Sequence, residues 1–434
     1  MEGAVIGNGV HTTEGKGVRV ATNGSTGSVF ENVKLCPPDA IFNVKNKYVA
    51  DKSPNKVNLG VGAYRTEKGE PWVLPVVRTI EAQMSVDSVL NHEYLAIDGL
   101  RAFTDASSRL LLGDSSLAIT QNRACGVQAL SGTGAIRLGL TFLFQNNSSK
   151  TIYLSNPTWG NHNGIASAVG YTDVRQYRYY KKETKGLDFE GMIQDIKEAP
   201  EGAVFILHTC AHNPTGVDPS TSQWKEILTV IKEKNIFVLF DTAYQGFASG
   251  DPDKDVFAVR EAVKMGMEFF AAQSFSKNFG LYNERTGQLC CVLKTPEVTT
   301  IVKSQLVVIC RRMWSNPPNH GARIVATALN NPSLKQEWIE NLTTMTSRIH
   351  SMRTELHSAL RANGTPGNWD HIIKQIGMFT FTGLTNSQVE HLTNKYHIYL
   401  LKNGRINMCG LNPSNIEYVA KALKDAVTAC PESC

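Results

Sequence analysis

The chain has 434 residues, of which 42% are apolar and 19% are charged, and its formal net charge is +5. These values are typical of a globular protein with a large buried core. The mild charge and the lack of a lysine–arginine block argue against nucleic acid as a partner, and no apolar run approaches the roughly 18 residues of a membrane helix. Nine cysteines without a CxxC pair predict free thiols in a reducing compartment and no zinc site.

The N-terminal segment 1–27 is rich in glycine, threonine, asparagine and serine and contains no aromatic residue. This composition predicts a disordered extension. It has neither the apolar core of a signal peptide nor the arginine-rich pattern of a transit peptide, so the cytoplasm is the expected compartment and an organelle stays open. Residues 28–52 predict an arm and a short helix, and residues 57–65 predict an apolar strand that ends in close-packing glycines.

Residues 127–137 predict a strand, a glycine-rich turn and the start of a helix. A helix N-terminus offers free N–H groups and the positive end of its dipole to a phosphate. The spacing is not GxGxxG, because Arg137 stands at the third glycine position. A cup for a single phosphate is therefore a better interpretation than a nicotinamide-binding Rossmann site.

Two further predicted strands end in polar turns. The strand over 151–154 leads to Trp159, which could stack on an aromatic cofactor or belong to the core. The next strand leads to an Asn-Pro-Thr-Gly turn at Asn213, close in sequence to His208 and His212. Two histidines could suggest a metal ion, but no carboxylate joins them, which favours a polar network.

Two charged side chains follow predicted buried strands. Asp241 ends the apolar run 237–240, where a carboxylate is costly unless it is paired. A protonated pyridine nitrogen would be a suitable partner, although Asp241 could also cap the following helix. Burial would lower the pKa of Lys277, so that its neutral amine could attack an aldehyde; the alternative is a surface lysine. Ser274 and Arg285 flank this lysine and suit a phosphate.

The C-terminal third predicts a long helix over 334–360 and strands over 372–383, 398–401 and 404–410. Before it, a helix that stops at a pair of prolines carries Arg311 and Arg312. Adjacent helical side chains point about 100° apart, so only one of these arginines can face a given site.

One stretch, residues 274–285, resembles the lysine segment of class I aminotransferases, and specifically of the aspartate aminotransferases. It reads Ser-Phe-Ser-Lys-Asn-Phe-Gly-Leu-Tyr-Asn-Glu-Arg, and the resemblance extends over residues 28–426. It implies the α/β fold of pyridoxal-phosphate transferases of fold type I. A large domain with a mostly parallel sheet between helices is then joined by a smaller α/β domain. The implied segments are an arm with part of the small domain (28–71), a large cofactor-binding domain (72–344) and the small domain (345–434).

The resemblance also implies a set of residues around pyridoxal 5′-phosphate. Lys277 would join the cofactor as an imine and then move the substrate proton, and Asp241 would hold the ring nitrogen protonated. Trp159 would stack on the ring, and Asn213 and Tyr244 would contact its phenolate oxygen. The implied phosphate ligands are Ser131, Gly132, Thr133, Ser274 and Arg285, with Tyr94 from the other subunit of a homodimer that shares its active sites.

The same resemblance implies the substrates, which are amino acids and 2-oxo acids. Arg405 would bind the α-carboxylate and Arg311 of the second subunit the distal carboxylate, while Gly62, Trp159 and Asn213 would border the substrate. The implied reaction is ping-pong transamination between L-aspartate and 2-oxoglutarate, which gives oxaloacetate and L-glutamate. An aminotransferase for aspartate and aromatic amino acids is the alternative, and a nicotinamide oxidoreductase and a non-catalytic interaction protein are the rivals from other classes.

Overall fold

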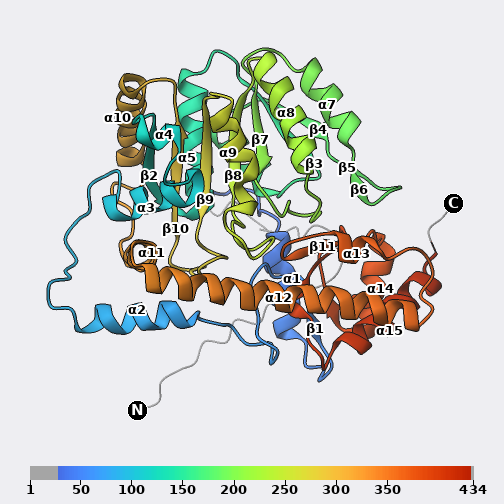
Figure 1. The fold of residues 1–434 in the computed structure, drawn as a ribbon. Coiled ribbons are helices and arrows are strands. Elements are labelled where there is room, and N and C mark those ends of the chain that lie inside the picture. Colours follow the sequence, from blue (N-terminus) through green and yellow to red (C-terminus); the bar gives the residue numbers. More distant parts are fainter. Residues whose placement is uncertain (1–27, 432–434) are drawn as a thin grey trace. The chain divides into compact units, whose positions relative to one another are not determined.

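A seven-stranded sheet organises the chain, with the order β2-β10-β9-β8-β7-β3-β4 (Figure 1). The computed structural model describes residues 28–431, in which residues from Ala40 onward form one unit and the preceding segment another. Only β10 runs antiparallel to its neighbours, and the other pairs are parallel. The predicted mostly parallel α/β sheet is thus confirmed. The strands are β2 (Ala124–Leu130), β3 (Thr151–Asn156), β4 (Asp173–Arg178), β7 (Val204–His208), β8 (Phe237–Thr242), β9 (Phe269–Ser274) and β10 (Thr286–Val292).

Helices cover both faces of this sheet, which explains why its inner strands are continuous apolar runs rather than alternating ones. In β9, Phe269 and Ala271 belong to one core, whereas Phe270 and Ala272 belong to the other. The first core includes α4 (Leu117–Thr120), α7 (Phe189–Glu198), α8 (Thr221–Glu233) and α9 (Phe257–Lys264). The second includes α5 (Ser131–Asn146), α6 (Asn161–Val169) and α10 (Pro296–Met313).

The direction of the strands places the site. The carboxyl ends of parallel strands meet at one edge of a sheet, where ligands of open α/β sheets bind. The strands β2, β3, β7, β8 and β9 therefore bring their polar ends to the same edge, and β10 starts there. Asp241 stands near the end of β8, Ser274 ends β9, and Ser131 begins α5 directly after β2.

The longest helix, α12 (Pro332–Ala362), contains the predicted helix over 334–360. The Asn331 side chain accepts hydrogen bonds from the backbone of Ser333 and Leu334, and Pro332 occupies the first helical position, so both residues favour a start at this point. The helix packs against α2 and α11 near its start and against α13 and α15 farther along, which is visible in Figure 1. The partners are α2 (Pro75–Val86), α11 (His320–Asn330), α13 (His371–Lys374) and α15 (Ile416–Ala429).

The remaining elements are short. Two small sheets pair β1 (Val57–Asn58) with β12 (Ile398–Tyr399) and β11 (Phe379–Phe381) with β13 (Arg405–Asn407), and a hairpin pairs β5 (Tyr180–Lys181) with β6 (Gly186–Leu187). The other helices are α1 (Ala40–Ala50), α3 (Arg101–Leu112) and α14 (Asn386–Tyr396), with 3-10 turns η1 (Lys254–Val256) and η2 (Met408–Gly410).

Several predicted strands are wrong in extent. Residues 372–374 of the predicted strand 372–383 belong to helix α13, and only β11 is a strand. The buried Arg353 guanidinium donates to the carbonyl oxygens of Ile372, Gly377 and Phe379, so these groups do not need a strand partner. The predicted strand over 57–65 likewise shrinks to β1, and the carbonyl of Gly60 beyond it accepts a hydrogen bond from the Arg405 side chain instead of from a strand.

The predictions for the N-terminal region have different outcomes. The predicted disordered extension, residues 1–27, lies outside the described residues. The predicted short helix is α1, and residues 28–39 form turns and irregular backbone with Val29 and Phe30 largely exposed. Across residues 28–431, no helix combines the length and the apolar character that a bilayer crossing requires.

Candidate active site

Most of the predicted site residues meet in one cavity of about 100 Å³ at the carboxyl edge of the large sheet. Its walls come from the start of α5, the loop after β3, the turn after β7 and the ends of β8 and β9. The lining residues are Ser131, Gly132, Thr133, Ile136, Trp159, Asn213, Asp241, Ala243, Tyr244, Ser274, Ser276, Lys277 and Arg285. Segments up to about 150 residues apart in sequence therefore form a single site.

Three serine hydroxyls cluster at one end of this cavity. The Oγ of Ser131 lies 2.9 Å from that of Ser274 and 2.8 Å from that of Ser276. The backbone is close there too, since a Cβ on Gly132 would lie only 3.1 Å from the Ser274 Cβ. Because Ser131 begins α5, the free N–H groups of the first helical turn face the same place. Hydroxyls, N–H groups and a helix dipole together suit an anion.

Arg285 adds a cation to this serine cluster. Its carbonyl accepts a hydrogen bond of 3.0 Å from the Ser131 backbone, and both residues have a left-handed backbone, with φ of +52° and +60°. Its guanidinium donates to the Tyr282 carbonyl at 2.7 Å, which leaves other N–H groups for the cavity. Strained φ values of this kind persist where surrounding structure holds them, and they cluster at binding sites.

Asp241 is buried and forms a hydrogen bond with a histidine. Its Oδ2 lies 3.0 Å from the Nε2 of His162. A carboxylate only accepts hydrogen bonds, so Nε2 carries the proton, and Nδ1 of His162 accepts from the Thr158 hydroxyl at 2.8 Å. Burial by itself would raise the pKa of Asp241, but the His162 hydrogen bond and nearby positive charge hold it below its ordinary value. The site therefore keeps a buried negative charge.

A second layer of histidines lies behind this pair. His208 contacts the Thr158 hydroxyl at 3.5 Å, and burial lowers the pKa of its imidazole to about 3. One ligand atom each of His162, His208 and Asp241 lies within 4.8 Å of the others, a spacing that also suits a metal ion. The hydrogen bond between His162 and Asp241 already uses the facing atoms, so the arrangement supports the predicted polar network. The ring of His212 bridges the hydroxyls of Ser155 and Thr215 instead.

Lys277 reaches the same cavity from the loop after β9. Burial lowers the pKa of its ammonium to about 8, the Asp241 carboxylate opposes this shift, and the charges of Arg285 and Arg405 add to it. Its Nζ lies 5.5 Å from the centre of the Tyr244 ring. At pH 7 about a tenth of this lysine is thus a neutral amine, far more than for a lysine with the ordinary pKa of 10.5, and the neutral form is the one a nucleophile or a base requires.

Arg405 stands beside the cavity and is almost completely buried without a carboxylate partner among the described residues. It donates to the Asn213 side chain at 3.1 Å and to the Gly60 carbonyl at 2.8 Å, and it lies 4.0 Å from the centre of the Phe379 ring. Its Nε has no hydrogen-bond partner. Burial lowers the pKa of Arg405 to about 10, and the guanidinium stays charged. An unpaired buried cation next to a cavity fits an anionic ligand.

Besides Arg405, which stands beside the cavity, three predicted residues do not line it. Tyr94 is 84% exposed and Arg311 is also exposed, with its guanidinium directed to the Ser315 hydroxyl. Gly62 lies against the Phe379 ring, 3.0 Å from where its Cβ would be. A single chain therefore does not bring Tyr94 and Arg311 into the site.

Sequence reasoning missed some contributors. Ser276 joins the serine cluster and lies next to Lys277, so its place in the same motif was a signal that could have identified it. Thr158 had the same kind of signal, since it stands next to Trp159, whereas Phe379 had none. They matter only because the fold carries them to His162 and Arg405.

The comparisons with known proteins agree with this geometry. Residues 54–423 match the family model of aminotransferases of class I and II. The cytoplasmic aspartate aminotransferase of Gallus gallus is 52% identical over 406 residues, which cover 92% of this chain and 98% of the relative. The cytoplasmic enzyme of Caenorhabditis elegans is 50% identical over 402 residues, 93% of this chain and 98% of the relative.

Solved structures give the same result. Aspartate aminotransferase from the cytoplasm of Saccharomyces cerevisiae has a TM-score of 0.91 at 46% identity, and the match covers 93% of this chain and 99% of that one. An aromatic-amino-acid aminotransferase from Burkholderia pseudomallei, covalently bound to pyridoxal phosphate, has a TM-score of 0.89 at 38% identity, over 92% and 99% of the two chains. The family match spans most of the residues that form the fold and the cavity described above, and this chain belongs to the class I and II aminotransferases.

Proposed function

We propose that the chain is an aspartate aminotransferase that uses pyridoxal 5′-phosphate to transfer the amino group of L-aspartate to 2-oxoglutarate, giving oxaloacetate and L-glutamate. The observation that carries this proposal is the single cavity in which a buried lysine, a buried carboxylate and a serine–arginine cup meet. The high identity to aspartate aminotransferases supports it, whereas an aromatic relative is more distant, at 38% identity.

The residues present fit the cofactor. The hydroxyls of Ser131, Ser274 and Ser276, the first turn of α5 with Gly132 and Thr133, and the Arg285 guanidinium would hold its phosphate. Asp241 would hold the ring nitrogen, Trp159 would cover the ring, and Asn213 and Tyr244 would contact its phenolate oxygen. When bound, pyridoxal phosphate supplies an electron sink for the substrate carbanion.

Lys277 would do two tasks. Its amine would carry the cofactor between turnovers, and once free it would take the proton from the substrate Cα and deliver it to the C4′ carbon of the cofactor. The pKa of about 8 suits both tasks, because the amine needs to lose its proton only slightly above neutral pH and is neutral far more often than an ordinary lysine. Asp241 would support this step by keeping its negative charge against the ring nitrogen, and the hydrogen bond from His162 favours the charged form.

Two arginines would select a dicarboxylic substrate. Arg405 is already buried beside the cavity and would clamp the α-carboxylate, with Gly62, Trp159 and Asn213 alongside. Arg311 would bind the distal carboxylate in the cavity of a second copy of the chain, and Tyr94 would reach the phosphate there. The exposed positions of both residues support a homodimer with shared sites, as do the exposed apolar residues Val29, Phe30, Val33 and Leu35.

Two further proposals concern the division of the chain into domains and its location in the cell. The seven-stranded sheet lies within residues 72–344, and the small sheets β1–β12 and β11–β13 draw on residues 28–71 and 345–434, which supports a large and a small domain. The names of the two relatives given above, both cytoplasmic, support the cytoplasm as the location.

The test is an absorbance measurement on the purified protein. The proposal requires an absorbance band of the bound cofactor that L-aspartate bleaches and 2-oxoglutarate restores. Equal rates with aspartate and phenylalanine would favour the broader aspartate/aromatic enzyme instead. A protein that takes up no cofactor would contradict the proposal.

A further inference from the structure

Two exposed segments carry Tyr94 and Arg311, the residues that the proposed function assigns to the site of a second subunit. Tyr94 is 84% exposed and precedes α3, and Arg311 is exposed in the last turn of α10. Exposed side chains and loops sample many conformations unless other contacts hold them. The contacts that fix these segments therefore decide how Tyr94 and Arg311 are presented to a second copy.

A chain of hydrogen bonds joins Arg311 to the residue that follows Tyr94. The Arg311 guanidinium donates to the Ser315 hydroxyl, which in turn donates to Oδ1 of Asn316 at 3.0 Å. The Asn316 amide nitrogen donates to the Leu95 carbonyl at 2.5 Å, across 221 positions of sequence. Residues 94–100 and 311–318 are thus connected at the surface, and they are called the paired segments below.

Gln128 connects the same two segments from inside the protein. This residue of β2 is completely buried. Its Oε1 accepts from the Leu100 N–H at 2.9 Å, and its Nε2 donates to the Pro318 carbonyl at 2.7 Å. Its backbone N–H donates to the Asp98 carbonyl at 2.9 Å. One amide therefore satisfies a donor of the first paired segment and an acceptor of the second, which requires a side chain that both accepts and donates.

The backbone packs closely around this amide. Gly99 has a left-handed backbone with φ of +98°, and a Cβ on it would lie only 2.2 Å from the Gln128 Cβ. A further link, the ion pair of 2.7 Å between Asp98 and Lys303 of α10, is partly exposed and so contributes little. A buried N–H or carbonyl that loses its partner is costly, which makes Gln128 the link whose removal should loosen both paired segments most.

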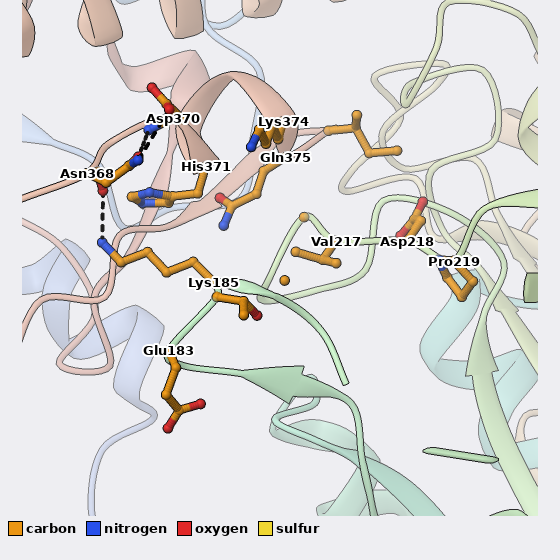
Figure 2. Close-up of a pocket in the computed structure, with 14 residues that line it drawn as sticks. Glu183, Lys185, Val217, Asp218, Pro219, Asn368, Asp370, His371, Lys374 and Gln375 are labelled. Carbon is orange, nitrogen blue, oxygen red and sulfur yellow. Dashed lines mark hydrogen bonds between the residues drawn. The ribbon is translucent and has the colours of Figure 1, made fainter. Parts of the chain in front are cut away.

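Two cavities of similar volume accompany the candidate active site. The first, of about 670 Å³, lies between the β5–β6 turn and α13, is lined by three carboxylates and two lysines, and includes no residue of the paired segments (Figure 2). The second, of about 650 Å³, is lined by both paired segments and by Arg285. The paired segments therefore border open space next to the serine–arginine cup, where side chains of a second copy have room.

We propose that Gln128 is a positioning residue for the active site of the neighbouring subunit, because it fixes the paired segments so that Tyr94 and Arg311 reach that site together. This inference rests on the proposed function and on its homodimer with shared sites. Gln128 does not line the cavity of its own chain. Its loss should therefore impair the cavity of the other subunit more than its own.

Hybrid dimers test this assignment, since they separate the contributions of the two subunits. One subunit carries Lys277→Ala, so turnover occurs only in the cavity of the other subunit, and two different affinity tags allow this parent hybrid to be purified. Gln128→Met in the Lys277→Ala subunit should raise the KM for aspartate about tenfold or more, the effect of losing one charge-assisted hydrogen bond to the substrate. The KM for phenylalanine, which lacks the distal carboxylate, should rise much less. Gln128→Met in the other subunit should change the KM for aspartate far less.

Equal rises for the two placements overturn the proposal, because Gln128 would then act on its own chain's cavity, and so does an unchanged KM in both. The matched control is Gln288→Met. Gln288 is also completely buried and lies opposite Gln128 in the register of β10 and β2, but its amide contacts Ser108 and Gln273. In the Lys277→Ala subunit this control should keep the KM of the parent hybrid; a rise equal to that of Gln128→Met would mean general loosening of the sheet and also overturns the proposal.

Hydrogen–deuterium exchange of the cofactor-loaded homodimers gives a second measurement that needs no turnover. In Gln128→Met the amides of both paired segments should exchange faster, whereas in Gln288→Met they should exchange as in the unchanged protein. Unchanged exchange of the paired segments in Gln128→Met refutes the role of Gln128. Lack of transamination by the unchanged protein refutes the proposed function instead, so the two failures are distinguishable. Thermal unfolding checks that each variant is folded.

Discussion

The Nε2 of His162 lies 3.0 Å from Oδ2 of Asp241, and the Thr158 hydroxyl fixes the other nitrogen of the same ring at 2.8 Å. The chain of three residues runs from the loop after β3 to the end of β8. It holds a carboxylate in its charged form at a position where burial alone would raise the pKa and favour the protonated form. The contribution of these two hydrogen bonds to activity can be measured by substituting His162 and Thr158.

Replacing His162 should make the charged form of Asp241 less stable. In His162→Ala the carboxylate loses a charge-assisted hydrogen bond of about 1.5–3 kcal/mol, so kcat/KM for aspartate should fall by about 10–100-fold. The pKa of Asp241 should rise. As the pH is lowered, the activity should therefore begin to fall at a higher pH than in the unchanged protein. Thr158→Val, which removes only the outer hydrogen bond, should have a smaller effect. Unchanged pH profiles in both variants would contradict this role.

Lys277 is expected to be indispensable for turnover but not for folding. Lys277→Ala should keep the serine–arginine cup and still bind the cofactor, whereas transamination should fall by at least about 10²–10⁴-fold, because the general base is lost. Absorbance and half-reaction rates with aspartate measure the two effects separately. The control is Lys225→Ala, an exposed lysine on α8, which should behave normally. Wild-type turnover by Lys277→Ala would refute the mechanism.

The buried lysine also predicts how the apoprotein captures its cofactor as a function of pH. Burial lowers the pKa of Lys277 to about 8, below the ordinary value of 10.5, and only the neutral amine attacks an aldehyde. The rate of reconstitution should therefore rise as the pH increases through about 8 and level off above it. Stopped-flow absorbance of the apoprotein mixed with pyridoxal phosphate gives this profile. A rate that keeps rising to pH 10 would mean an ordinary, exposed lysine.

Arg311 and Arg312 offer a matched pair on α10. Removal of a clamp from a buried carboxylate costs about 3–5 kcal/mol, so Arg311→Ala should reduce kcat/KM for aspartate and glutamate by about 10²–10⁴-fold. Phenylalanine lacks the distal carboxylate and should be affected far less. Arg312→Ala should leave all three substrates nearly unchanged. Equal losses on the three substrates in Arg311→Ala would argue against the assignment.

Arg353 is predicted to stabilise the region that supports Arg405. It is 2% exposed and donates to three backbone carbonyls and to the Thr380 hydroxyl, and burial lowers the pKa of its guanidinium to about 9. Arg353→Met leaves these acceptors without donors, so unfolding by urea should show a loss of about 3 kcal/mol or more. Arg361→Met, an exposed arginine on the same helix, is the control and should lose little. Equal stability of the two variants would contradict this account.

Much of the fold was readable from the chain. The apolar runs before Asp241 and Ser274 predicted buried strands, and both are inner strands of the sheet, because residues covered on both faces must be apolar throughout. The prediction of a strand over 372–383 was wrong in extent, because the Arg353 side chain, from a distant helix, donates to carbonyls that a strand partner would otherwise bind. No local pattern contains that information.

The candidate site shows the same division between what the local sequence predicts and what contacts between distant segments decide. The sequence by itself identified which residues carry chemistry through the match of residues 274–285 to a known family, whereas Lys277 and Asp241 taken singly left open a surface lysine and a helix cap. Only the tertiary structure decided that Ser276 completes the serine cluster, that Asp241 is the partner of His162, and that Arg405 is buried against Phe379. These outcomes depend on contacts between segments far apart in the chain, and such contacts are set by packing rather than by local pattern or propensity.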